Sequence, residues 1–382
     1  MIKSRIFLFP YWLTLKIRHW LYDTGRIKGK SYPIPVICIG NVTVGGTGKT
    51  PHVEMIIRLL QDRMNIAVLS RGYKRRTKGF HLLEESDSAQ ISGDEPLQIK
   101  QKFPDILVAV CEDRQKGIEE ILNIIGNKSI KANTPDNSED FPLEGTDIFS
   151  QPEKPWIILL DDAFQHRRVI PSKNILLVDW NRPIDQDELL PLGNLRDLPE
   201  QKKRADIVIV TKCPQMGFME GIQVEEAARE AAIQQEAIWR KKLKLRPDQD
   251  LFFTSIDYCT PQGVFPKECN TRYIYSKEAI AFSGIATNKD FFNHVELNFK
   301  MKDAISFADH RNFTQSDISH IDSLSRNNPL AVVLTTEKDS KRLINSRYIN
   351  KDLKAKLFYV PIKVNILSKQ AQAEFISRLL SM

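Results

Sequence analysis

Short apolar runs alternate along the chain with segments whose apolar residues have helical spacing. The runs cover residues 34–39, 66–69, 106–110, 156–160, 175–178 and 207–210, and helical segments cover 53–60, 97–102 and 114–125. Short continuous runs rich in β-branched residues are typical of parallel strands with both faces buried. Strands that alternate with helices in this way predict an α/β fold built on a doubly wound, mostly parallel sheet.

The alternation continues on a smaller scale in the C-terminal part. We expect a long helix over residues 224–245, two strands joined by a turn over 251–275, strands over 280–282 and 331–334, and a helix over 317–324. These elements predict a core domain at residues 31–250, a two-stranded linker at 251–277 and a smaller C-terminal α/β lobe at 278–382. Residues 127–155 are polar and lack periodicity, which predicts a mobile surface insertion in the core domain.

The N-terminal segment, residues 1–30, combines apolar, aromatic and basic side chains. Residues 6–15 are mostly apolar, and Leu13, Ile17, Trp20 and Leu21 share one helical face. The run is shorter than the roughly 20 residues that span a bilayer, and no signal-peptide cleavage site follows it. We therefore expect an amphipathic helix lying in the plane of an anionic membrane surface. The alternative is an ordinary amphipathic helix packed on the core domain.

Composition narrows the classes of partner. The 382 residues are 42% hydrophobic and carry a net charge of +7, which suits a globular core and an anionic partner. A nucleotide, a phospholipid surface or a nucleic acid would fit, but no nucleic-acid-reading motif is present, so we expect no nucleic acid. The five cysteines lack C-x-x-C spacing, which disfavours a zinc site and a disulfide framework and favours a reducing, cytosolic compartment.

The strongest chemical signal is the stretch Gly-Asn-Val-Thr-Val-Gly-Gly-Thr-Gly-Lys-Thr-Pro at residues 40–51. It lies between an expected strand and an expected helix, the context of a phosphate-binding loop in P-loop NTPase-like folds. The residues expected to bind the nucleotide are Thr43, Val44, Gly45, Gly46, Thr47, Gly48, Lys49 and Thr50. Lys49 can reach the β- and γ-phosphates of ATP, and Thr50 can ligate Mg²⁺.

The glycine spacing departs from the usual phosphate loop. Residue 43 is threonine instead of glycine, and the glycines at 45, 46 and 48 resemble the G-G-x-G-K-T loops of one branch of phosphate-loop proteins. Members of that branch that act as membrane or partition switches carry a lysine where this chain has Val44. The loop therefore favours an enzyme over that kind of switch.

Carboxylates follow two further expected elements. The strand at residues 156–160 closes on Asp161 and Asp162, the Walker-B pattern that holds Mg²⁺ directly or through water. Asp94 and Glu95 stand together at the entry of the helix over residues 97–102, where the simpler interpretation is a helix cap with an acidic first turn. The stretch at 211–214 does not match the N-K-x-D guanine-reading motif, so GTP specificity is not supported.

Taken together, these residues resemble the tetraacyldisaccharide 4′-kinase family of lipid A biosynthesis. The matching motifs, in the family's order, are residues 40–51, 70–73, 93–96, 161–166, the loop from Leu190 to Arg196, residues 282–286, Asp309-His310 and Thr336-Glu337-Lys338-Asp339. Departures are Ala163 in place of glycine, Asp197-Leu198 in place of Glu-Pro, Arg311 after His310, and the insertion at 127–155.

The resemblance implies a kinase that transfers the γ-phosphate of ATP to the 4′-hydroxyl of a tetraacylated glucosamine disaccharide 1-phosphate. Such an acceptor stays in the inner membrane, so the resemblance implies a peripheral protein on the cytoplasmic face, with no protein partner evident. It also implies that Asp94 and His310 form a base dyad, that Lys49 assists transfer, and that Thr50, Glu95 and one of Asp161 and Asp162 hold Mg²⁺. The expected substrate contacts are Arg71, Tyr73, His166, Arg167 and Arg196.

Two other functions remain open from the residues alone. A membrane-associated nucleotide switch without kinase activity would use the same loop and the same basic N-terminus, but it would not need Asp94 and His310. A phosphate-loop kinase or ligase of a soluble metabolite would leave the amphipathic segment at residues 6–22 without a purpose.

Overall fold

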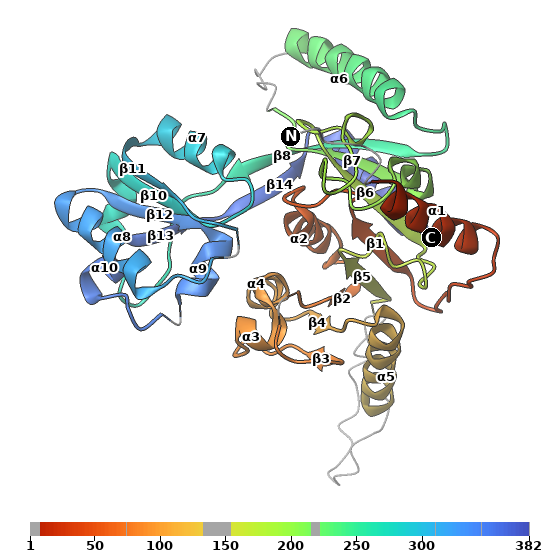
Figure 1. Ribbon diagram of the computed structural model, residues 1–382, viewed down its shortest axis with the longest axis horizontal. Coiled ribbons are helices and arrows are strands. Elements are labelled where there is room, and N and C mark those ends of the chain that lie inside the picture. The colour runs from red at the N-terminus through yellow and green to blue at the C-terminus, as the bar shows by residue number, and fades with distance from the viewer. Residues whose placement is uncertain are drawn as a thin grey trace, which may run out of the picture.

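The computed structural model describes residues 8–73, 75–132, 154–214, 222–309, 311–344 and 346–381. These residues form a large lobe around one sheet and a smaller lobe around a second sheet (Figure 1). The predicted insertion lies largely outside the described residues, and so does His310. The helix before the insertion continues to Ala132, beyond the expected end at residue 125.

The large sheet has nine strands in the order β14-β8-β7-β6-β1-β5-β2-β4-β3. Neighbours from β8 to β4 are parallel, and only the edge strands β14 and β3 pair antiparallel. The strands are β1 (Val36–Gly40), β2 (Asn65–Ser70), β3 (His81–Leu82), β4 (Leu107–Val110), β5 (Trp156–Asp161), β6 (Lys173–Asp179), β7 (Ile207–Thr211), β8 (Asp250–Tyr258) and β14 (Ile362–Ile366). The predicted doubly wound, mostly parallel sheet is confirmed.

Alternate residues of each central strand face opposite sides of the sheet. In β1, Cys38 belongs to one buried cluster while Ile37 and Ile39 belong to the other. Among the described residues, six α-helices supply side chains to these clusters: α1 (Phe9–Asp23), α2 (Lys49–Leu60), α4 (Asp94–Lys102), α5 (Arg114–Ala132), α6 (Ile222–Leu243) and α11 (Lys369–Leu380). Because helices cover both faces of the sheet, a ligand can approach the central strands only where those strands end.

The small lobe carries a five-stranded sheet in the order β11-β10-β12-β13-β9. Its strands are β9 (Gln262–Gly263), β10 (Glu278–Ser283), β11 (Lys300–Ser306), β12 (Val332–Thr336) and β13 (Leu357–Val360), and its helices are α7 (Lys289–Asn298), α8 (Gln315–Asn327), α9 (Glu337–Leu343) and α10 (Lys351–Lys356). Helices α3 (Ala89–Ser92) and α4 (Asp94–Lys102) belong to the large lobe, and α4 contacts α9 across the junction (Figure 1).

The expected domain boundaries were wrong in two places. The two strands of the expected linker do not pair with each other, because β8 joins the large sheet and β9 joins the small one. The last residues of the expected C-terminal lobe return to the large lobe, where β14 pairs with β8 and α11 buries Phe375 and Leu379. A local apolar pattern predicts a strand but does not say which sheet will bury it.

Candidate active site

The phosphate loop connects β1 to α2 in a tightly held conformation. Gly45 and Gly48 have φ of +85° and +80°, a region in which side chains other than glycine are strained. Inside the loop, Asn41 Nδ2 donates to Thr47 Oγ1 over 2.7 Å and the Thr47 N–H donates to the Gly45 carbonyl over 2.9 Å. Bonds within the protein therefore define the shape of the loop.

A second loop clamps the phosphate loop from outside. The Val44 N–H donates to the Asn194 carbonyl over 2.7 Å, and the Arg196 N–H donates to the Val42 carbonyl over 2.9 Å. These bonds place the side chain of Arg196 beside the loop, where its Nη2 donates to Asn41 Oδ1 over 2.7 Å. The loop that includes Arg196 thus supports both the backbone and a side chain of the phosphate site.

The start of α2 is fixed to the sheet by His52, a side chain that sequence reasoning did not select. Its Nδ1 bonds to the Gly48 carbonyl over 2.7 Å and its Nε2 bonds to Thr254 Oγ1 over 2.9 Å. A carbonyl only accepts, so the neutral ring donates from Nδ1 and accepts at Nε2. Burial lowers the pKa of His52 to about 4, so the ring is neutral at neutral pH.

Asp162 lies directly opposite the phosphate-loop lysine. Its Oδ1 is 3.8 Å from Lys49 Nζ, and both of its oxygens accept hydrogen bonds from the guanidinium of Arg196. Burial acts to raise the pKa of Asp162, but the charges of Lys49 and Arg196 hold it below its ordinary value. The structure therefore brings together Lys49, Asp162 and Arg196 from three separate segments.

Asp161 has the opposite electrostatic environment. Burial, together with the negative charges of Glu95 and Asp162, raises the pKa of Asp161 to about 7. Its Oδ2 accepts from Ser70 Oγ over 3.3 Å, whereas Oδ1 is buried and has no hydrogen-bond partner among the described residues. A buried, unpartnered carboxylate oxygen surrounded by like charges suits a bound cation.

The carboxylates near the phosphate loop suit Mg²⁺, which takes few protein ligands, better than they suit a metal ion that the protein coordinates completely. Among the described residues, no three His, Cys, Asp or Glu side chains form a group that could hold a metal ion. Mg²⁺ normally takes one or two carboxylates and completes its shell with waters and phosphate oxygens. Asp161 with the Thr50 hydroxyl at the start of α2 is a donor set of that kind.

The small lobe contributes cations to the carboxylates at the start of α4. Lys338 Nζ lies 3.0 Å from Glu95 Oε1, and Arg342 Nη2 lies 2.9 Å from Asp94 Oδ2. A Cβ added to Gly46 would lie 3.8 Å from Thr287 Oγ1, so a small-lobe loop also lies close to the phosphate loop. The candidate site is therefore built from both lobes.

The position of His310 is not described, but its chain neighbours are. A Cβ on Gly284 would lie 3.3 Å from the Ala308 carbonyl oxygen and 3.3 Å from the Arg311 Cβ. Ala308 and Arg311, on either side of His310, therefore pack against Gly284, and Arg342 Nη1 donates to the carbonyl of Gly284 over 3.3 Å. The pairing of Asp94 with His310 stays a prediction.

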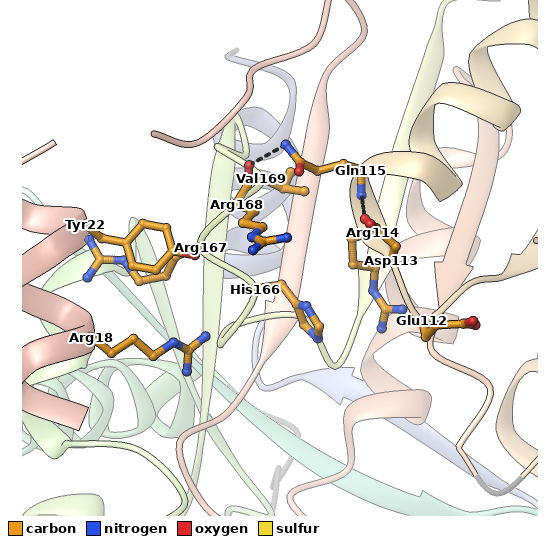
Figure 2. Close-up of a pocket in the computed structure, with 10 residues that line it drawn as sticks. All are labelled: Arg18, Tyr22, Glu112, Asp113, Arg114, Gln115, His166, Arg167, Arg168 and Val169. Carbon is orange, nitrogen blue, oxygen red and sulfur yellow. Dashed lines mark hydrogen bonds between the residues drawn. The ribbon is translucent and has the colours of Figure 1, made fainter. Parts of the chain in front are cut away.

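A basic pocket of about 320 Å³ lies between α1, the loop after β4 and the loop after β5 (Figure 2). It is lined by Arg18, Tyr22, Glu112, Asp113, Arg114, Gln115, His166, Arg167, Arg168 and Val169. Figure 2 shows the side chains of Arg18, His166 and Arg114 directed toward the space between α1 and α5. Burial, followed by the charges of Arg114 and Arg71, lowers the pKa of His166 to about 4, so this ring is a neutral hydrogen-bonding group.

Three of the predicted substrate contacts, Arg167, Tyr73 and Arg71, lie in other surroundings than His166. Arg167 pairs with Asp23 over 2.6 Å, donates to His19 and lies over the ring of Tyr22, so it fastens α1 to the large lobe. Tyr73 is 64% exposed and Arg71 is also exposed, both in the loop after β2. The structure therefore brings His166 into the pocket, turns Arg167 toward α1 and leaves Tyr73 at the surface.

Helix α1 combines a buried polar anchor with an exposed apolar surface. His19 Nε2 and Asp197 Oδ1 are 2.6 Å apart, with both side chains buried, and Tyr11 donates to the Arg196 carbonyl over 2.9 Å. Its exposed apolar side chains are Phe9, Tyr11, Trp12, Leu13, Ile17 and Trp20. No helix within the described ranges is long and apolar enough to cross a membrane.

Sequence reasoning missed the residues that support the site. Asn41 bonds to a side chain within the phosphate loop, His52 bonds to a carbonyl of that loop, and Arg342 bonds to a side chain of the other lobe. The one signal for these residues in the sequence is that Arg342 follows the Thr-Glu-Lys-Asp motif by three residues.

Comparisons with known proteins agree with this geometry. Residues 5–381 match the family model described as tetraacyldisaccharide-1-P 4′-kinase. A tetraacyldisaccharide 4′-kinase of Bacteroides fragilis (strain YCH46) is 39% identical over 97% of this chain and 91% of its own length. One of Flavobacterium johnsoniae is 37% identical over 96% of this chain and 94% of its own length.

A solved structure is similar over nearly all of both chains. It is described as the "apo" form of LpxK from Aquifex aeolicus in complex with ATP, and it matches with a TM-score of 0.64 and 26% identity over 98% of this chain and 99% of that one. The family match, the identity to curated relatives and the shared fold all extend over almost the whole sequence. The chain therefore belongs to the tetraacyldisaccharide-1-P 4′-kinase family.

Proposed function

We propose that the protein transfers the γ-phosphate of ATP to the 4′-hydroxyl of a tetraacylated disaccharide 1-phosphate in lipid A biosynthesis. The observation that carries this proposal is the meeting of Lys49, Asp161 and Asp162 at one edge of the large sheet, in a chain of this family. The Aquifex aeolicus structure is a complex with ATP, which supports ATP as the phosphoryl donor. Phosphoryl transfer depends mainly on positioning and charge neutralisation, which this arrangement can supply.

The phosphate loop would hold the donor. The backbone N–H groups of residues 43–48 and the start of α2 would bind the β- and γ-phosphates, and Lys49 would neutralise charge on the transferred group. Thr50, Glu95 and one of Asp161 and Asp162 would hold Mg²⁺, which would neutralise negative charge on the phosphates during transfer. Lys338 would then have to release Glu95, with which it pairs over 3.0 Å.

The acceptor hydroxyl needs a base, because a sugar alcohol is a weak nucleophile. Asp94, oriented with His310 from the small lobe, would take its proton. A base completed by the second lobe makes transfer depend on lobe contact, which keeps water from the γ-phosphate.

The basic pocket would receive the anionic head of the acceptor. Arg18, Arg114 and His166 supply cationic and neutral donors that suit phosphate oxygens, and the pocket adjoins α1. The exposed aromatic side chains of α1 would rest in the headgroup region on the cytoplasmic face of the inner membrane. A lipid acceptor could then reach the site without leaving the bilayer.

Mass spectrometry of the product tests the proposal. The protein is incubated with ATP, Mg²⁺ and the tetraacylated disaccharide 1-phosphate in mixed micelles. A glycolipid that gains one phosphoryl group supports the kinase. Slow release of ADP with unchanged glycolipid would instead favour the alternative, a membrane-associated nucleotide switch without kinase activity.

A further inference from the structure

Arg342 is a small-lobe side chain that reaches the candidate base of the large lobe. Its Nε and Nη2 both donate to Asp94 Oδ2, over 3.0 and 2.9 Å, and its side chain is only 5% exposed. Two donors from one planar guanidinium fix the direction of a carboxylate more closely than a single point charge can. The contact is therefore directional as well as electrostatic.

The guanidinium is itself held by a buried network. Its Nη1 donates to Asp339 Oδ1 over 2.9 Å. Asp339 is fully buried, and its Oδ2 accepts from Thr336 Oγ1 over 2.7 Å and from the Gly284 N–H over 2.9 Å. A buried polar network whose members are all bonded is rigid, so Arg342 presents its remaining donors in one orientation.

The same network reaches the segment that precedes and follows His310. Gly284, which bonds to both Asp339 and Arg342, packs against the Ala308 carbonyl and the Cβ of Arg311. Farther along this loop, Thr287 lies close to Gly46 of the phosphate loop. One hydrogen-bonded unit in the small lobe therefore contacts Asp94 and supports the chain on either side of His310.

We propose that Arg342 is a positioning residue, which holds the carboxylate of Asp94 in one orientation relative to the small-lobe loop at Gly284. The same contact then joins the two lobes and orients the base, Asp94. The inference rests on the proposed function, in which Asp94 takes the proton of the acceptor hydroxyl. It gives the Thr-Glu-Lys-Asp motif a purpose, because Thr336 and Asp339 hold Arg342 in place.

A neighbouring ion pair provides a matched control. Lys102 on α4 and Glu337 on α9 are 3.0 Å apart, so they also join the two lobes, but Lys102 pairs with Glu337 and Glu54 and makes no ion pair with Asp94. If Arg342 only fastened the lobes together, Lys102→Ala and Arg342→Ala would have similar consequences. If Arg342 orients Asp94, only Arg342→Ala should impair the transfer step.

The test compares steady-state kinetics of the full-length variants in mixed micelles. We expect Arg342→Ala to lower kcat by roughly 10²-fold with little change in the KM for ATP, because a misplaced catalytic group costs about that much. Added methylguanidinium with Arg342→Ala should recover part of kcat, whereas Arg342→Lys, which supplies a point charge without the planar pair of donors, should recover little. Asp94→Ala with Arg342→Ala should be no slower than Asp94→Ala alone, because residues that act as a unit are not additive.

Three results would overturn the inference: wild-type kcat in Arg342→Ala, an equal loss in Lys102→Ala, or losses that multiply in the double variant. Backbone hydrogen exchange at residues 283–287 and 306–309 gives a readout that needs no acceptor. Faster exchange there in Arg342→Ala but not in Lys102→Ala supports the network, and unchanged exchange contradicts it. A wild-type protein that phosphorylates no glycolipid would instead count against the proposed function.

Discussion

Asp161 and Asp162 are adjacent in the chain, yet the protein gives them opposite electrostatic environments. Asp162 faces Lys49 and Arg196, which keep its pKa low against the effect of burial. Asp161 is buried beside other carboxylates, and its pKa is raised to about 7. Asp162, with a φ of +49°, leaves the extended conformation of the strand that ends at Asp161. The position of the two residues at the end of β5 does not by itself predict that their pKa values shift in opposite directions.

At the residue scale, we predict that Asp94→Ala lowers turnover by roughly 10²-fold or more, the usual loss when general-base help is removed. ATP should still bind, because the phosphate loop and Lys49 are unchanged. Kinetics together with equilibrium ATP binding would check this. Asp322→Asn is a suitable control, since Asp322 pairs with Arg326 on α8 and its side chain is 15% exposed, against 20% for Asp94. Equal turnover in the two variants would exclude Asp94 as the base.

A second residue-scale prediction concerns pH and His52. The unfolded ring takes a proton near pH 6.5, while the folded ring does so only near pH 4, so the unfolded state binds more protons between these values. The stability that His52 contributes is therefore complete above about pH 6.5 and declines as the pH falls toward 4.

Urea unfolding of the wild type and of His52→Leu, from pH 7 to pH 4, measures this effect. The variant should be less stable at pH 7 by about 1–3 kcal/mol, the cost of losing buried hydrogen bonds. The difference between the two proteins should shrink on acidification. A difference that stays constant with pH would show that His52 is not held neutral by the fold.

At the scale of elements, α1 has an exposed aromatic surface next to the basic pocket. We predict that Trp12→Ser with Trp20→Ser weakens binding to anionic vesicles roughly tenfold or more, because burial of parts of two indole rings contributes on the order of 2 kcal/mol. Trp12 and Trp20 are 38% and 48% exposed.

Sedimentation with vesicles provides the measurement. Leu297→Ser with Leu330→Ser removes two apolar side chains of the small lobe that are even more exposed, at 85% and 73%, and should leave binding unchanged. Equal weakening by both pairs would mean that exposed apolar area in general drives the association, and α1 would lose its special role.

The sequence was informative wherever an element is local. The buried parallel strands appear as continuous apolar runs, and the phosphate loop follows the first of them, so the core sheet and the partners Lys49 and Asp162 could be predicted. The packing of β14 and α11 on the large lobe could not be predicted, because their apolar patterns would suit burial in either lobe. Arg342 was missed for a related reason: its role depends on contact between helices more than 200 residues apart, as the 248-residue separation from Asp94 shows.

At the scale of the whole molecule, the chain crosses between the lobes twice. It leaves the large sheet after β8 and returns to pair β14 with that same strand, over residues 362–366. The small lobe is therefore an insertion between two paired strands of the large lobe. This connection restricts how the lobes can separate while Arg342, Lys338 and Lys102 pair across the junction.

We predict that truncation after Val360 disrupts the large lobe instead of trimming the small one. The missing segment includes β14 and α11, and it buries Val364, Ile366, Phe375 and Leu379 in the core cluster that also contains Val53 and Ile56 of α2. ATP affinity and thermal stability should both fall sharply, since α2 begins at the phosphate loop. Full ATP affinity in the truncated protein would show that this contact is dispensable.

Identifying the molecule that receives the γ-phosphate of ATP most directly tests the claim that this site phosphorylates a membrane lipid. With γ-labelled ATP, Mg²⁺ and vesicles that contain the tetraacylated disaccharide 1-phosphate, the wild type should move the label into the glycolipid, and Lys49→Ala should move almost none. Label that appears only as free phosphate, or equal transfer by Lys49→Ala, would contradict the claim that this site phosphorylates a membrane lipid.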